Sequence, residues 1–249
     1  MDWSGRILVI HHDPAVPAGA YGDVLATCGA PVEHVELHAG VPLPALAGCR
    51  AIVALGGPMG ALDDHVLPAL AQERRLLAAA VAAGVPVWGV CLGAQLLAAA
   101  LGGDVRRGDR PELGMHDLVR AAGAEDDPVG AMLPVRMPVL QWHRDTFTLP
   151  EGARRLAGSD LYENQAFAVG SAYGVQFHAE VGLDAVRTWA GHPSFATELR
   201  ARHGAGFVDA ILAPTAAHAP AGNLLARALL TTWLGTFVLP QHDHQGVSL

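Results

Sequence analysis

The stretch that decides the fold reads VPVWGVCLGAQLLAAAL and begins at Val85. Its first part, residues 85–90, is an apolar run, and its last part, residues 92–101, is rich in alanine and leucine. Cys91 stands between the two parts, with a glycine two positions away on either side. We predict a strand, a sharp turn and a helix, in the cysteine version of the nucleophile-elbow pattern Gly-x-Ser-x-Gly.

The position of this cysteine predicts chemistry as well as shape. Gly89 and Gly93 let the backbone bend tightly and leave room for a substrate beside the sulfur. The free N–H groups and the dipole at the start of the following helix stabilise negative charge, so they favour the Cys91 thiolate. We therefore expect an enzyme with a thiol nucleophile.

The rest of the first half alternates strand-like and helix-like segments. Strands are predicted at residues 6–11, 32–37 and 51–55, and helices at residues 20–28 and 68–83. The second of these helices begins with Pro68 and is followed by Gly84, the usual asymmetry of helix ends. Strands and helices at this spacing form βαβ units. We therefore predict an α/β fold of three layers, a mainly parallel central sheet with helices on both faces.

The second half shows a different pattern. Its shorter strand-like runs predict antiparallel additions to the sheet, at residues 115–120, 137–142, 166–169 and 173–178. Helices are then expected at residues 195–203, 207–212 and 223–234, with an alanine- and proline-rich connection at 213–221 and a loose tail at 240–249. We predict one domain over residues 1–190 and a helical C-terminal extension packed on it over residues 191–249.

Composition excludes several classes of protein. The formal net charge of the 249 residues is −8, and the lysines and arginines are scattered, so no basic stripe offers a footprint for nucleic acid. No apolar stretch is both long enough and free enough of helix breakers to cross a bilayer, and the N-terminus lacks the layout of a signal peptide. We expect a cytoplasmic protein without a membrane partner.

Cysteines and histidines give no sign of a disulfide framework or a metal site. The three cysteines have no paired spacing, and Cys28 and Cys49 are interpreted as packing residues. The thirteen histidines show none of the compact spacings that are typical of zinc sites, and residues 241–245 (QHDHQ) fit a solvated tail better than a chelating site. We expect neither a metal nor a cofactor.

A thiol nucleophile needs a base, and the base needs an orienting partner. His178 and Glu180 follow a good strand and are two residues apart, so in an extended segment their side chains point to the same face. Glu180 can then fix the tautomer of His178 and stabilise its imidazolium form. A lone His-x-Glu is more often structural, and Cys91 is what reverses that interpretation.

A glycine loop follows another predicted strand. Residues 56–60 (GGPMG) come directly after residues 51–55. Backbone N–H groups in such a turn can stabilise a developing oxyanion, although an ordinary tight turn has the same composition. The loop does not fit a phosphate-binding loop, because no Lys-Ser/Thr pair follows it.

Several separated motifs, in order along the chain, resemble those of class I (triad) glutamine amidotransferases. They are residues 56–60, residues 89–95 (GVCLGAQ) and residues 178–180 (HAE). Residues 142–147 (WHRDTF), 164–167 (NQAF) and 173–178 (YGVQFH) are similar to a stand-alone subgroup, close to the amidotransferase domain of GMP synthase and to plant γ-glutamyl peptidases. The resemblance covers the chain from the first strand to Glu180 and implies a flavodoxin-like three-layer fold.

The resemblance implies roles for individual residues. Cys91 is the nucleophile, His178 its base and Glu180 the orienting carboxylate, and the N–H groups of Gly57 and Leu92 form the oxyanion hole. The residues expected to contact the substrate are Gln95, His143, Gly56 and Met59. Two departures stand out: Ala179 replaces the proline of the usual His-Pro-Glu, and Pro111 and Met115 stand where relatives often carry a basic and an aromatic residue. The second departure bears on specificity.

Several functions fit these motifs. The first is a glutamine-hydrolysing subunit that gives ammonia to a separate synthase. The second is a stand-alone γ-glutamyl peptidase, because the attacked γ-carbonyl is the same and only the leaving group differs. A non-catalytic binding protein ranks last since all three triad residues are present, and a DJ-1/PfpI-type protein is disfavoured because the Leu55-Gly56-Gly57 strand end offers no carboxylate.

Overall fold

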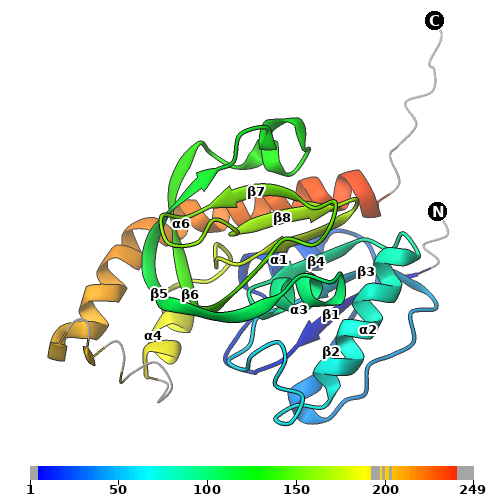
Figure 1. Ribbon diagram of the computed structural model, residues 1–249, viewed down its shortest axis with the longest axis horizontal. Coiled ribbons are helices and arrows are strands. Elements are labelled where there is room, and N and C mark those ends of the chain that lie inside the picture. Colours follow the sequence, from blue (N-terminus) through cyan, green and yellow to red (C-terminus); the bar gives the residue numbers. More distant parts are fainter. Residues whose placement is uncertain (1–4, 192–196, 198–199, 202–203, 240–249) are drawn as a thin grey trace, which may run out of the picture.

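A single mixed sheet of nine strands forms the centre of the molecule (Figure 1). The computed structural model describes residues 5–191, 197, 200–201 and 204–239. The strands are β1 (Arg6–His11), β2 (Val32–Glu36), β3 (Cys49–Ala54), β4 (Val87–Val90), β5 (Val105–Arg120), β6 (Arg136–Phe147), β7 (Arg154–Gly158), β8 (Ala166–Val169) and β9 (Ala172–Val175). Their order across the sheet is β2-β1-β3-β4-β9-β8-β7-β5-β6.

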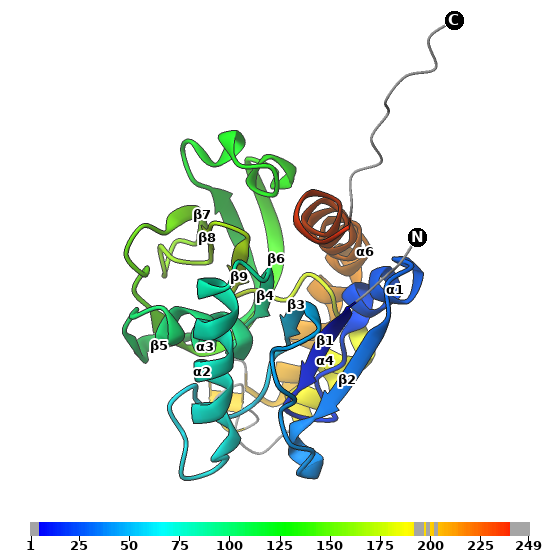
Figure 2. The ribbon, with the colours of Figure 1, turned by 90° about the vertical axis from the view of Figure 1, so that its right-hand side faces the viewer.

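Helices cover both faces of this sheet. They are α1 (Gly19–Thr27), α2 (Ala69–Ala82), α3 (Leu92–Ala100), α4 (Leu183–Gly191) and α6 (Phe207–Trp233), and α6 continues into one π-helical turn, η5 (Leu234–Val238). Short 3₁₀ turns lie at η1 (Leu37–Ala39), η2 (Ala124–Asp126), η3 (Gly130–Met132) and η4 (Gly204–Gly206). Figure 2 shows α2 and α3 on one side of the sheet and α1 and α6 on the other.

The continuous apolar runs of the first strands reflect burial on both faces. In β1, Ile7 and Val9 pack into the core cluster that contains residues of α1 and α6, while Leu8 and Ile10 pack into the cluster that contains residues of α2 and α3. A strand of a parallel sheet covered on both faces needs apolar side chains in every position. β1 to β4 pair in parallel, as the βαβ spacing predicted. β9 pairs in parallel with β4 and antiparallel with β8, whereas the run 173–178 was predicted as an antiparallel addition only.

The remaining strands, β5 to β8, add antiparallel pairs, as predicted. β5 and β6 are longer than predicted, and β7 was not predicted. β5 begins at Val105, ten residues before the predicted run 115–120, and it pairs with β6 along most of its length. β9 ends at Val175, so the predicted strand 173–178 is too long. His178 lies beyond the strand end, where it forms an isolated antiparallel bridge with Leu140 of β6.

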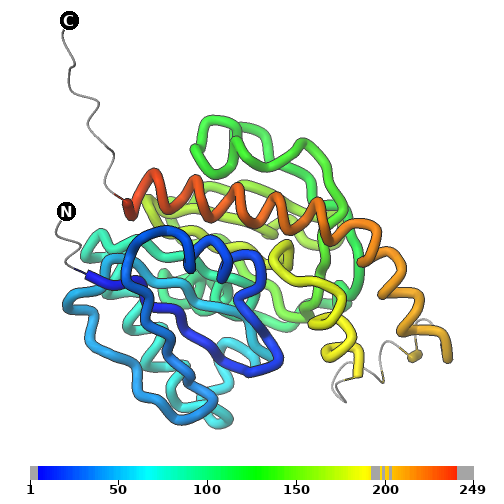
Figure 3. Tube along the Cα trace, turned by 180° about the vertical axis from the view of Figure 1, so that it is seen from behind, coloured from blue at the N-terminus to red at the C-terminus, as the bar shows by residue number. Residues whose placement is uncertain are grey.

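The prediction of a connection at residues 213–221 is wrong, because α6 runs through this segment without a break. Pro214 and Pro220 lie inside the helix, and each lacks one backbone N–H donor. Burial of Ile211 and Thr215 and the high alanine content outweigh this loss. Figure 3 shows that the helix changes direction in its orange part, the part that holds the prolines.

The C-terminal part of the chain packs against the sheet rather than extending from it. α6 contacts α1, α4, β5 and β6. The division at residue 190 stays a prediction, and the predicted helix 195–203 and tail 240–249 lie largely or wholly outside the described residues. In the described part of the chain, no helix is long and apolar enough to span a bilayer.

Candidate active site

Cys91 lies at the turn between β4 and α3 in a strained backbone conformation. Its φ is 51° and its ψ is −104°, and no other non-glycine residue among those described has a positive φ. The two flanking glycines make this turn possible. A Cβ on Gly89 would lie 2.6 Å from the Gly93 carbonyl oxygen, and a Cβ on Gly93 would overlap the carbonyl oxygen of Ala54 in β3. The elbow therefore needs glycine at both positions.

His178 and Glu180 form a buried pair beside this cysteine. The distance from His178 Nδ1 to Glu180 Oε1 is 2.7 Å, and both residues are almost fully buried. The His178 ring lies beside Cys91, since a Cβ on Gly56 would be within 3.7 Å of both side chains. Since Nδ1 is engaged by Glu180, the nitrogen available to the sulfur is Nε2.

Electrostatics favour the protonated form of this histidine. Burial of the ring lowers its pKa, but the negative charges of Glu180 and of the Cys91 sulfur outweigh burial and raise the pKa of His178 to about 10. An imidazolium next to Cys91 stabilises a thiolate there. The site can therefore hold a nucleophile and a proton donor side by side at neutral pH.

Three elements hold the segment that carries His178 and Glu180. The backbone N–H of His178 donates to Leu140 O of β6 at 2.8 Å, and Ala20 N, at the start of α1, donates to Glu180 O at 2.8 Å. Asn223 Nδ2 of α6 donates to Ala179 O at 2.9 Å. The segment is thus fixed although no regular strand contains it.

The glycine loop after β3 lies against both Cys91 and His178. A Cβ on Gly56 would be 3.3 Å from His178 Cε1 and 3.7 Å from Cys91 Cβ. A Cβ on Gly57 would be 2.8 Å from Leu92 Cδ2, which leaves no room for a side chain. As the first residue of α3, Leu92 has a backbone N–H with no acceptor inside the helix.

A polar cavity of about 510 Å³ opens on one side of Cys91. Five of the predicted site residues line it: Gly57, Met59, Cys91, Gln95 and His143. It also carries charges of both signs, from Asp63 and Asp145 and from Arg106, Arg107 and Arg144. Such a cavity suits a small molecule with both an ammonium and a carboxylate group.

Gln95 is held at the wall of this cavity by two hydrogen bonds. Its Nε2 donates to Gln176 Oε1 at 3.0 Å and to the backbone carbonyl of Asp145 at 3.3 Å. Burial, and then the negative charge of Asp63, raise the pKa of the Asp145 carboxyl, and Arg107 opposes this rise. Asp145 therefore contributes to the wall through its backbone as well as its side chain.

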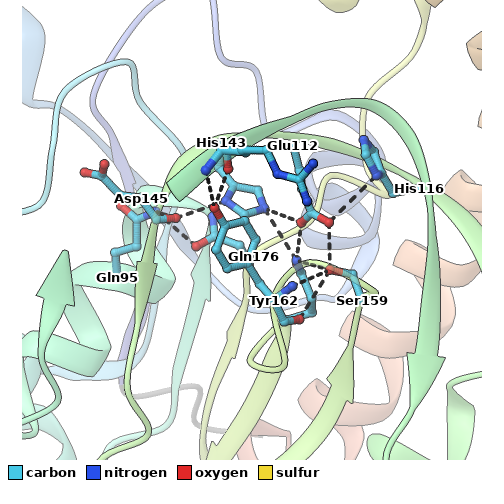
Figure 4. Close-up of polar contacts among 10 residues, drawn as sticks. Gln95, Glu112, His116, His143, Asp145, Ser159, Tyr162 and Gln176 are labelled. Atoms are coloured by element: carbon cyan, nitrogen blue, oxygen red, sulfur yellow. Dashed lines mark hydrogen bonds and ion pairs between the residues drawn. The ribbon is translucent and has the colours of Figure 1, made fainter. Parts of the chain in front are cut away.

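Behind the wall lies a buried polar network centred on Glu112 (Figure 4). Glu112 is fully buried and is the cross-strand partner of His143 in the β5–β6 pair. Its carboxylate accepts hydrogen bonds from Ser159 Oγ at 2.7 Å and Gln165 Nε2 at 2.6 Å, and it lies 3.0 Å from His143 Nε2. Burial raises the pKa of Glu112, but the hydrogen bonds of His143 and Ser159 outweigh it and lower that pKa overall.

Comparisons with known proteins place this geometry in a family. The family model described as Glutamine amidotransferase class-I matches residues 23–188. The chain belongs to the class-I glutamine amidotransferases. It is therefore an enzyme of the glutamine amidotransferase type.

Individual relatives of this amidotransferase agree with the family. It is 37% identical over 144 residues to the protein of Methanoculleus marisnigri that is named as one subunit of a glutamine-hydrolyzing GMP synthase, a match of 56% of this chain and 70% of that protein. It is 35% identical over 164 residues to the glutamine-hydrolyzing GMP synthase of a Synechococcus species, and there it spans 60% of its own length but only 28% of the relative.

Solved structures match over almost the whole chain. A glutamine amidotransferase from Thermotoga maritima shares 31% identity and a TM-score of 0.81, covering 94% of this chain and 99% of that one. A glutamine amidotransferase from Methylobacillus flagellatus shares 28% identity and a TM-score of 0.82, covering 98% and 99%. The three-layer fold predicted from the sequence is thus confirmed.

Sequence reasoning missed several residues that shape the amidotransferase site. Glu112, Ser159 and Gln165 support the wall of the polar cavity, and Trp189 of α4 packs its ring on His178 with centroids 4.8 Å apart. A buried His12–Glu73 pair at 2.8 Å, near the glycine loop, was missed as well. Gln165 lies directly before β8, within the motif at residues 164–167, but that motif gave it no role, and nothing local pointed to Trp189. Among the described residues, no three His, Cys, Asp or Glu side chains gather as metal ligands.

Proposed function

We propose that this amidotransferase hydrolyses the γ-amide of glutamine, or of a related γ-glutamyl compound, to glutamate through a Cys91–His178–Glu180 triad. The observation that carries the proposal is the elbow cysteine beside a buried histidine whose Nδ1 meets Glu180 at 2.7 Å. A nucleophile, a base and an orienting group in this sequence are the parts that acyl transfer requires.

Two steps follow from this arrangement. Cys91 Sγ forms a bond to the γ-carbon, and the tetrahedral intermediate collapses with cleavage of the C–N bond, while the proton held by His178 passes to the leaving nitrogen. A water molecule then attacks the γ-glutamyl thioester. His178 takes a proton from this water and keeps it, and the second tetrahedral intermediate expels the Cys91 thiolate. Glutamate leaves and the starting pair of imidazolium and thiolate is restored.

The oxyanion of each tetrahedral intermediate needs backbone donors. We assign this role to the N–H groups of Gly57 and Leu92, which flank Cys91 from the glycine loop and from the start of α3. Gly56 keeps the loop close to both Cys91 and His178. The absence of side chains at 56 and 57 lets the substrate carbonyl approach.

The amino-acid end of the substrate is assigned to the polar cavity. Its acidic side chains suit the α-ammonium group, and its arginines suit the α-carboxylate. Gln95 and Met59 contribute to its wall, and His143 positions the Asp145 carbonyl through a hydrogen bond of 3.0 Å from Nδ1. This places the γ-carbonyl over Cys91, where the cavity ends.

Two destinations of the nitrogen are compatible with this chemistry. The relative from Methanoculleus is named as one subunit of a GMP synthase, which supports a separate synthase as the partner that takes up ammonia. The alternative is a stand-alone γ-glutamyl hydrolase that releases a larger amine. A non-catalytic role is disfavoured because the triad is intact.

Glutamate release by the purified chain tests the proposal. Glutamine and a panel of γ-glutamyl dipeptides serve as substrates. Cys91→Ala is compared with Cys28→Ala, a matched loss of a cysteine that does not line the polar cavity. We expect glutamine cleavage that survives Cys28→Ala and is lost in Cys91→Ala. Preference for the dipeptides would favour the peptidase. No cleavage together with no selective thiol labelling at Cys91 would contradict the triad.

A further inference from the structure

Two cavities of different character meet at Cys91. Gly57, Pro58, Cys91 and Trp142 line both of them. The polar cavity of about 510 Å³ extends toward Gln95 and Asp145. The second cavity, of about 60 Å³, extends to the other side of the sulfur, and His178 lines this one.

The smaller cavity has a mainly apolar wall, built by segments far apart in the sequence. Ala15 and Val16 come from the loop after β1, Thr188 and Trp189 come from α4, and Trp142 comes from β6. Trp189 Nε1 donates to Ala15 O at 2.8 Å, which ties α4 to the loop. Val16 and the two tryptophans are buried to at least nine-tenths, so the wall is firmly packed.

The mechanism assigns this smaller cavity to the leaving group. In the proposed first step, His178 gives its proton to the departing nitrogen, so that nitrogen must lie on the His178 side of the γ-carbon. Any substituent on the nitrogen then extends into the smaller cavity. The glutamyl part cannot occupy it, because its charged groups need the polar cavity.

This cavity is larger and less polar than a site for ammonia needs to be. A water-sized group takes roughly 10–15 Å³ of such volume, so about 60 Å³ holds roughly four to six such groups. An apolar wall gains nothing from ammonia, whereas an alkyl chain would displace water from it. Asp13 also lines the cavity, with Oδ1 accepting a hydrogen bond from Ala15 N at 2.8 Å, and its negative charge disfavours a carboxylate there.

We propose that the preferred substrates are γ-glutamyl amides of small apolar primary amines, with an alkyl group of up to about four carbons in the smaller cavity. This inference rests on the proposed function and specifies its leaving group. The bonds formed and broken are those given above: the C–N bond is cleaved, the amine leaves with the proton of His178, and water releases glutamate from the thioester. A γ-glutamyl dipeptide fits poorly, since it brings a carboxylate toward Asp13.

A homologous series of substrates tests the inference. The series consists of the N-methyl, N-ethyl, N-propyl and N-butyl amides of glutamate at its γ-carboxyl, with glutamine and γ-glutamylglycine for comparison and Cys91→Ala as the blank. We expect kcat/KM for glutamate release to rise about fourfold per added methylene until the cavity is full, because each buried methylene contributes a roughly constant transfer energy. The kcat/KM for γ-glutamylglycine should be lower than that for the N-methyl amide.

Two opposite substitutions of equal volume locate the effect. Val16→Thr adds a hydroxyl to the apolar wall, and Thr188→Val removes one from its rim. We expect the ratio of kcat/KM for the butyl and methyl amides to fall severalfold in Val16→Thr and to rise about twofold in Thr188→Val. Val135→Thr is the matched control, because Val135 is exposed and lines neither cavity, and its ratio should not change.

Three results would overturn the inference, and they are distinct from failure of the proposed function. The first is a flat or falling series while glutamine is cleaved. The second is a preference for the γ-glutamyl derivative of 1,4-diaminobutane over the butyl amide, which would assign the cavity to a cationic amine. If the isolated chain turns over no substrate, the amides are instead ranked by how well each protects Cys91 from iodoacetamide. Equal protection by all of them is the third such result. Absence of both turnover and selective Cys91 labelling would instead reject the triad itself.

Discussion

Two buried histidine–glutamate pairs, His178–Glu180 and His143–Glu112, differ in their relation to the nucleophile. In the first pair His178 Nδ1 meets Glu180 at 2.7 Å, and in the second His143 Nε2 meets Glu112 at 3.0 Å. Burial is nearly the same in both pairs. The second nitrogen makes the difference, because that of His178 is directed to Cys91 whereas that of His143 is bound by the Asp145 carbonyl at 3.0 Å.

This difference teaches how to interpret a buried His–Glu pair. Both ring nitrogens of His143 face acceptors, so the ring is held between Glu112 and the backbone of Asp145. Such a histidine supports the cavity wall and has no proton to exchange with a substrate. His178 keeps one nitrogen for a reacting atom, which is what a general base requires.

The largest expected effect is the difference in activity between variants of the two histidines. His178→Gln should lower kcat/KM for glutamate release by roughly 10³-fold or more, since it removes the proton shuttle. His143→Gln should lower it by less than about tenfold, through looser positioning of Asp145 and a higher KM. Steady-state kinetics of both variants, with circular dichroism to verify the fold, make the comparison. Equal losses in the two variants would mean that the pairs do not differ as described.

Replacement of the two glutamates should change the free energy of unfolding by different amounts. Glu112→Gln replaces a fully buried carboxylate that accepts hydrogen bonds from Ser159 and Gln165 and meets His143. We expect it to lower the free energy of unfolding by about 3 kcal/mol. Glu180→Gln should cost less stability and more activity, because the imidazolium of His178 retains the Cys91 sulfur as a partner. Urea unfolding followed by tryptophan fluorescence measures the first effect. A Glu112→Gln variant as stable as the parent chain would show that the Glu112 carboxylate does not stabilise the network.

The pH dependence of catalysis should change when Glu180 is replaced and should not change when Glu112 is replaced. The pKa of His178 is raised to about 10, so the imidazolium persists through neutral pH and is lost only as the pH rises through about 10. The alkaline limb of kcat/KM should therefore lie near pH 10. Replacing Glu180 by Gln removes a charge that raises this pKa, so the limb should move to lower pH. In Glu112→Gln the limb should stay in place, and a shift there would contradict the account.

The smallest effect is expected at the edge of the Glu112 network. His116 Nδ1 lies 3.7 Å from Glu112 Oε1, and its side chain is 27% exposed. Partly solvated pairs of this length contribute little, so His116→Gln should change the free energy of unfolding by less than about 1 kcal/mol. Its kcat/KM should equal that of the parent chain. A loss as large as that of Glu112→Gln would extend the essential network to His116.

The same comparison explains which parts of the site the sequence could predict. The His178–Glu180 pair is local, and a spacing of two residues in an extended segment places both side chains on one face. Glu112 and His143 are 31 residues apart and meet only because of the β5–β6 register, which no local pattern determines. Trp189 and Asn223 reach the site from helices after the last recognised motif, so their roles depend on tertiary packing.

The fold was predictable to a similar extent. The βαβ spacing and the glycines around Cys91 are local constraints with few alternatives, and the parallel half of the sheet follows from them. The helix through Pro214 and Pro220 was not predictable, since proline normally ends a helix and only burial of its neighbours outweighs this tendency. Helix propensity is a weaker constraint than the steric requirement for glycine at an elbow.

The most direct test of the triad is the rate at which iodoacetamide alkylates Cys91 at pH 6, measured by peptide mass spectrometry. An unassisted thiol is protonated at this pH and reacts slowly. We predict that Cys91 reacts much faster than Cys28 and Cys49, that His178→Gln removes the difference, and that His143→Gln preserves it. If Cys91 reacts no faster than the other two cysteines, or if both histidine variants behave alike, the claim that His178 activates Cys91 is wrong.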